Sequence, residues 1–221
     1  MTELRLIAGT AVAEPLEAEP MPALRLPPGR HGIPADLVRA HQRQRLLEAA
    51  AAALAEQGYG RLTAARVTEL AGVSSRTFYQ HFEDLWACLL AAYETEAALL
   101  CAEIESGCGT AGDERDSRAQ GGIAVALDFL ACRPSVARLL SAEPPPQIAA
   151  LAGARRDLVE RLGTMLRAAL TDPEGATPLP GLERRLVGAA LALVSSRAAS
   201  GDPQRLRDLE PELSELLLVS L

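Results

Sequence analysis

Apolar residues recur at helical spacing along most of the chain, and Gly or Pro residues separate the periodic stretches. The first stretch runs from Pro34 to about Gln57 and stops at Gly58, a residue typical of helix C-termini. Two short helices follow, one over 63–70 and one capped by Ser74. Longer patterns then cover 85–104, 117–132, 134–142, 147–171, 181–200 and 203–219. Because no segment shows the period-two alternation of a strand, we expect an all-α fold of about nine helices.

Charge and proline content divide the chain into unlike parts. Residues 1–33 contain five prolines and no sustained period, which indicates a flexible N-terminal leader. The chain carries a net charge of −7, yet residues 25–82 hold eight Arg and four acidic residues. A basic segment in an acidic protein indicates a module that binds a polyanion. We therefore expect a binding domain over 34–84 and a second domain over 85–221, in which 106–116 form a loop.

Composition excludes several classes of protein. Hydrophobic residues make up 48% of the chain and aromatic residues 3%, which excludes general disorder and favours a helical core of Ala, Leu and Val. The four cysteines lack zinc or redox spacing and are interpreted as reduced thiols. We find no run of about 18 apolar residues, no secretory signal and no catalytic motif. The expectation is a cytoplasmic protein that is not an enzyme, has no membrane partner and uses no metal or cofactor.

The most informative segment spans residues 62–81. Two short helices flank the tight turn Ala71-Gly72-Val73-Ser74, where Gly72 can adopt a positive φ and Ser74 can cap the next helix. This arrangement predicts a helix-turn-helix, whose second helix enters the major groove of DNA.

The second helix of this motif separates apolar from polar side chains. At about 100° per residue, Phe78 and Phe82 share one face and are expected to point inward. Arg76 and Gln80, on the other face, suit bidentate contacts to guanine and adenine. Neighbouring hydroxyl and N–H groups suit phosphate oxygens. The alternative is a solvated polar face. The expected DNA contacts are Arg45, Thr63, Arg66, Ser74, Ser75, Arg76, Thr77, Tyr79, Gln80 and His81.

Residues 43–92 resemble the DNA-binding domain of TetR-type transcriptional repressors. The resemblance rests on Gly58-Tyr59, Thr63, the turn described above, Thr77-Phe78-Tyr79 and His81-Phe82. It implies three N-terminal helices for operator binding and a larger helical domain that binds a small effector and forms a four-helix dimer interface.

One position departs from the family pattern. Members usually carry a Lys shortly after the closing Phe, and this chain has Leu85 there, preceded by two acidic residues. Arg30, Arg43 and Arg45 are the candidates to replace the missing phosphate contact.

The second domain is expected to bind the effector and to form the dimer. Trp86, Tyr93 and Phe129 are the only aromatic residues after position 82, so each is a candidate pocket wall or else a plain core residue. Residues 186–194 are apolar almost all round, and leucines of 203–221 form one stripe. Paired with their two-fold copies, these helices would make an isologous interface. The expected contacts are Leu186, Leu191, Leu206, Leu209, Leu213 and Leu217.

These features predict a sequence-specific DNA-binding transcriptional regulator. We expect a homodimeric repressor that binds a palindromic operator and is released by a small apolar or amphipathic ligand. The alternative is a helical DNA-binding or ligand-binding protein without an effector-controlled role.

Overall fold

The computed structural model describes residues 34–111, 114–170, 181–199, 202 and 204–218. Ten helices and no strand occur among them, which confirms the expected all-α class, and one of the ten is a single turn. The described residues from Ala35 onward pack as one compact unit. The expected leader, including Arg30, lies outside the described residues. The helices are α1 (Ala35–Gln57), α2 (Ala64–Ala71), α3 (Ser75–His81), α4 (Leu85–Thr110), α5 (Arg115–Ala131), α6 (Pro134–Ser141), α7 (Ala149–Leu170), α8 (Leu182–Ala198), α9 (Gln204–Arg207) and α10 (Glu210–Leu218).

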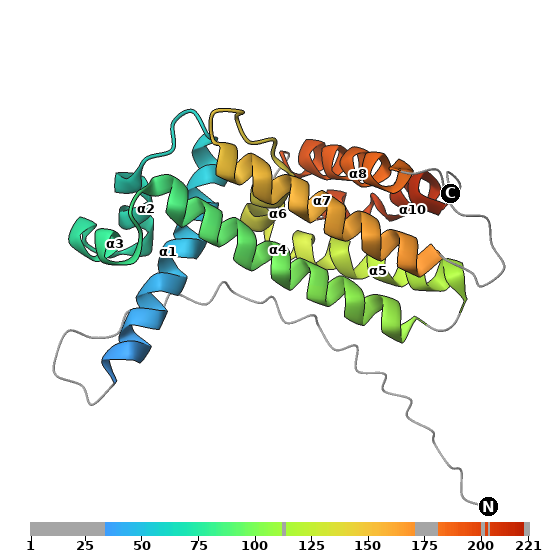
Figure 1. Cartoon of the computed structure of the whole chain (residues 1–221), viewed down its shortest axis with the longest axis horizontal. Coiled ribbons are helices and arrows are strands. Elements are labelled where there is room, and N and C mark those ends of the chain that lie inside the picture. Colours follow the sequence, from blue (N-terminus) through green and yellow to red (C-terminus); the bar gives the residue numbers. More distant parts are fainter. Residues whose placement is uncertain (1–33, 112–113, 171–180, 200–201, 203, 219–221) are drawn as a thin grey trace, which may run out of the picture. The chain divides into compact units, whose positions relative to one another are not determined.

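Helix α4 is the central element of the compact unit. It packs against α1, α5, α6 and α7, and Figure 1 shows it running beside α7 along the bundle. Its inward side is mostly apolar, with Leu89, Ala92 and Leu100 all buried. Among the described helices, α4 alone is long and apolar enough to meet the criteria for a membrane span, a property shared by core helices of water-soluble proteins.

Three glycines let α4 and α5 approach very closely. We call Gly107, Gly121 and Gly122 the glycine seam. A Cβ atom on Gly107 would lie 2.9 Å from the carbonyl oxygen of Gly121, and one on Gly122 would lie 2.8 Å from the Cys108 sulfur. Real Cβ atoms essentially never come this near, so the α4–α5 packing requires glycine at these positions.

Two predicted element boundaries are wrong. The segment 106–116 was expected to be a loop, but α4 continues to Thr110, because packing against α5 outweighs the poor helix propensity of glycine. The predicted helix over 203–219 is divided into α9 and α10. Pro211 lies in the first turn of α10, where a proline is tolerated; inside a continuous helix its ring would clash with the preceding turn.

Candidate functional site

Two side-chain caps and one glycine shape the helix-turn-helix. Thr63 Oγ1 accepts a hydrogen bond from the Arg66 backbone N–H at 3.2 Å and begins α2. Gly72 ends α2 with φ of 59°, in the left-handed region that favours glycine. Ser74 Oγ accepts from the Thr77 N–H at 3.1 Å and begins α3. The local sequence therefore fixes the angle between α2 and α3, as predicted.

The two faces of α3 have the predicted orientation. Phe78 is fully buried and Phe82 is 7% exposed, so both rings attach α3 to the domain core. Arg76 and Gln80 project into solvent, and the Tyr79 ring is 62% exposed. A large aromatic ring therefore lies at the surface of α3, beside the two polar side chains. Ser74 and Ser75 are also exposed, and Thr77 and His81 are half-buried.

Two of the expected DNA contacts, Arg45 and Arg66, have partners inside the protein. The Arg66 guanidinium lies 2.7 Å from the Glu56 carboxylate and 3.0 Å from that of Glu69. The Arg45 guanidinium donates to the backbone carbonyl of Ala71, which ties α1 to the turn between α2 and α3. Their positions indicate a supporting role for both residues, and direct DNA contact by either one stays a prediction.

The sequence of this region matches one family model. Residues 46–92, from α1 into the first turns of α4, match the model described as "Bacterial regulatory proteins, tetR family". This segment is a TetR-family DNA-binding domain. Among curated proteins, none matches the chain.

Solved structures share the fold of the TetR-family domain and of the bundle that follows it. FadR, a fatty acid degradation regulator from Bacillus halodurans, has a TM-score of 0.65 at 16% identity, over 80% of this chain and 98% of that one. A TetR-like regulator from Rhodococcus sp. RHA1 has a TM-score of 0.64 at 20% identity, over 80% and 94%. FadR from Bacillus subtilis, in complex with stearoyl-CoA, has a TM-score of 0.56 at 15% identity, over 80% and 98%. The chain thus has the fold of DNA-binding transcriptional regulators.

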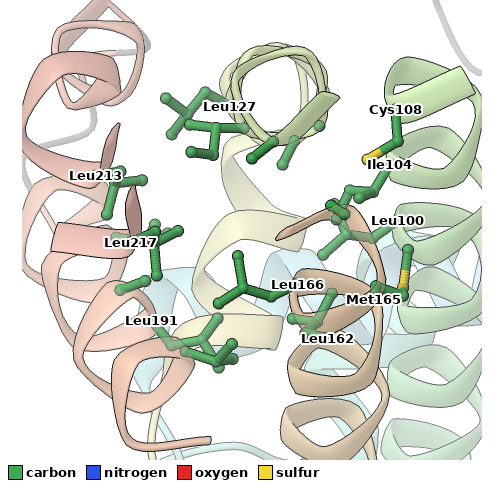
Figure 2. A pocket seen from close by; sticks show the side chains of 18 of the residues that line it. Leu100, Ile104, Cys108, Leu127, Leu162, Met165, Leu166, Leu191, Leu213 and Leu217 are labelled. Atoms are coloured by element: carbon green, nitrogen blue, oxygen red, sulfur yellow. The ribbon is translucent and has the colours of Figure 1, made fainter. Parts of the chain in front are cut away.

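The bundle that follows the TetR-family domain contains an apolar cavity of about 120 Å³. Helices α4, α5, α7, α8 and α10 supply its walls, and Figure 2 shows their aliphatic side chains directed at one another across the space. Leu100, Leu127, Leu166 and Leu191 are typical members, and none of the described residues that line the cavity is aromatic or charged. Among the described lining residues, Cys108 alone carries a titratable group, and burial raises the pKa of its thiol, so it stays protonated at neutral pH.

None of the three predicted pocket aromatics lines this cavity. Tyr93 is fully buried, and its hydroxyl donates to the Leu140 carbonyl at 3.5 Å. The Phe129 ring lies 4.4 Å from the Arg133 guanidinium carbon. Trp86 lines a separate hollow together with Tyr59. Sequence reasoning missed the actual walls because a leucine at a cavity and a leucine in a core occupy the same positions of a helical pattern.

The six leucines expected at a dimer interface lie inside the protomer. Each is 7% exposed or less, and Leu191, Leu213 and Leu217 line the cavity. The stripe therefore packs mainly on the chain's own helices, and a role of these leucines in a dimer stays a prediction. The exposed side of α8 carries small and basic residues instead, namely Arg185, Ala189, Ala192 and Ser196.

Proposed function

We propose that the protein is a cytoplasmic, non-enzymatic transcriptional repressor that binds a palindromic operator as a homodimer and leaves it when a ligand enters the bundle. The observation that carries this proposal is α3, whose buried Phe78 fixes an exposed face bearing Arg76, Tyr79 and Gln80. Arg and Gln are the side chains best shaped to read guanine and adenine edges. Two such helices on one dimer would read two half-sites about one helical turn apart.

Base readout by α3 is tested by substituting its two exposed reading residues. In the Arg76→Ala and Gln80→Ala variants, we expect selection from random duplexes to lose preference at one base pair per half-site, with about 1–3 kcal/mol less discrimination at each. Arg156→Ala, an exposed position on α7, serves as the control and should keep the wild-type motif. An unchanged motif in both α3 variants would remove the readout role, and no enriched motif in the wild type would remove the proposed function.

The cavity supports a ligand with a hydrocarbon segment. The described residues of its wall offer dispersion contacts and, apart from the Cys108 thiol, no polar side chain, so a charged group of the ligand would have to remain outside. An engineered cavity of about 150 Å³ accommodates benzene, so this one holds a short hydrocarbon segment as it stands. A longer chain would separate the helices around it. Since α4 follows α3 after only three residues, Phe82–Asp84, a displaced α4 would shift the DNA-binding domain.

A larger side chain in the cavity should weaken ligand binding and thereby prevent the displacement of α4. Ala126 lines it, so Ala126→Leu is expected to weaken binding of stearoyl-CoA, the compound present in the Bacillus subtilis FadR structure, by about tenfold. DNA affinity without the compound should not change. Ala102→Leu, on the exposed side of α4, is the matched control. Calorimetric titration measures the binding; equal affinity in both variants would place the compound elsewhere, and no binding in any of them would exclude it as the ligand.

A further inference from the structure

The first turn of α4 provides no cation for DNA. Leu85 occupies the place of the expected Lys, and Asp84 caps the helix by accepting from the Ala87 N–H at 2.7 Å. Glu83 beside it is exposed. A phosphate approaching this end of the recognition helix therefore meets two carboxylates, and any attraction must come from another element.

Two arginines and a histidine converge on the other side of the same end of α3. Arg39 and Arg43, one turn apart on α1, line a shallow hollow with His81, the last residue of α3. Ala40 and Asp36 complete the hollow, and Asp36 is the one acidic residue among the described residues that line it. The Arg43 guanidinium carbon lies 5.3 Å from the centre of the Phe82 ring, a cation–π contact that holds the side chain toward α3.

Among the described residues that line the hollow, the two arginines outnumber the one carboxylate, Asp36. Within the described residues, Arg66, Arg133, Arg155 and Arg207 all pair with carboxylates, whereas Arg39 and Arg43 contact none. The pKa of His81 is lowered, first by burial and then by the charges of Arg39 and Arg43. An anion placed among these groups would relieve their mutual repulsion.

We propose that Arg39, Arg43 and His81 form a clamp for a backbone phosphate of duplex DNA. The clamp rests on the proposed DNA-binding function and extends it to α1, since it supplies the contact that the start of α4 lacks. It lies where α3 ends, beside the exposed reading face, and phosphates border the groove that such a helix enters. Arginine and histidinium both donate charge-assisted hydrogen bonds to phosphate oxygens.

The clamp couples DNA binding to a proton. In the free protein, the lowered pKa keeps His81 neutral at pH 7. A bound phosphate favours the imidazolium and raises that pKa, so the complex binds more protons than the free protein. Affinity should accordingly increase as the pH falls through and below the ordinary histidine range of about 6.5.

The salt dependence of binding to a mixed-sequence duplex tests the clamp. For Arg39→Gln/Arg43→Gln, we expect the slope of log K against log salt to shrink by about 0.9 for each phosphate that is no longer neutralised, with affinity about tenfold lower near 0.1 M salt. Arg156→Gln/Arg161→Gln removes the same charge from the exposed side of α7 and should keep the slope. Arg39→Gln alone leaves the contact between Arg43 and the Phe82 ring intact and should reduce the slope by half as much. An unchanged slope, or an equal decrease in the control, overturns the clamp.

The pH dependence of DNA affinity tests the contribution of His81 separately from that of the arginines. Wild-type affinity for the same duplex is expected to rise severalfold between about pH 7.5 and 5.5, and His81→Gln should remove most of that rise. An equal rise in both proteins overturns the role of His81. If the wild type binds no duplex under any condition, the proposed DNA-binding function fails; if it binds and the variants match it, only the clamp fails.

Discussion

Replacing Gly121 by alanine is expected to lower the free energy of unfolding by about 2–3 kcal/mol, although a single methyl group is added. The new Cβ atom would lie 2.8 Å from the Gly107 carbonyl oxygen and 2.6 Å from the Ala111 Cβ. Neither neighbour is the end of a flexible side chain, so relief requires α4 and α5 to separate. These two helices form the most extensive helix contact in the bundle and also line the cavity, so the separation reduces packing along both.

Gly109→Ala is the matched control for this prediction. Gly109 lies in the same turn of α4 as Gly107, and a Cβ atom there would meet nothing within 4 Å. Alanine favours the helix over glycine by up to about 1 kcal/mol, so this variant should be as stable as the wild type or slightly more stable. Urea unfolding at one protein concentration measures both, since dimer formation would make stability depend on concentration. Equal stability of the two variants would show that the seam does not require glycine.

The DNA-binding domain could be predicted from the sequence because its determinants are local. Thr63, Gly72 and Ser74 act within about four residues of their own positions, and the four-residue spacing of Phe78 and Phe82 identifies the buried face of α3. The same reasoning failed at Gly107 and Gly109, where the sequence predicted a loop. The helical conformation there depends on α5, a partner that only the tertiary structure provides.

The role of the leucines in the bundle could not be predicted from the helical periodicity of the sequence either. A stripe such as Leu206, Leu209 and Leu213 indicates only that one side of a helix is buried. Whether it is covered by the same chain, by a second copy or by a ligand depends on distant elements. The structure places Leu213 against the cavity, and an ionic contact of α9, between Arg207 and Asp128 at 2.7 Å, fastens this region to α5.

The position of Leu213 reverses the expected result of a charged substitution there. On the sequence alone, Leu213→Arg would separate two protomers that each remain folded. In the structure, Leu213 is 5% exposed and borders a cavity whose described lining residues carry no charge, so an arginine would remove apolar burial and leave its own charge unpaired. We expect the free energy of unfolding to fall by at least about 4 kcal/mol, which would appear as unfolding at lower urea concentration and as aggregation.

A separate substitution tests the dimer without disturbing this core. Ala192 lies on the exposed side of α8, opposite the buried Leu191, Val194 and Ala198. If the proposed dimer uses this side, Ala192→Arg should sediment as a folded monomer, because two arginines would meet near the two-fold axis with no room or partner. The free energy of unfolding of the Ala192→Arg monomer should not show the large decrease expected for Leu213→Arg. A folded dimer in Ala192→Arg would place the interface on another surface, whereas a folded monomer in Leu213→Arg would show that the leucine stripe joins protomers after all.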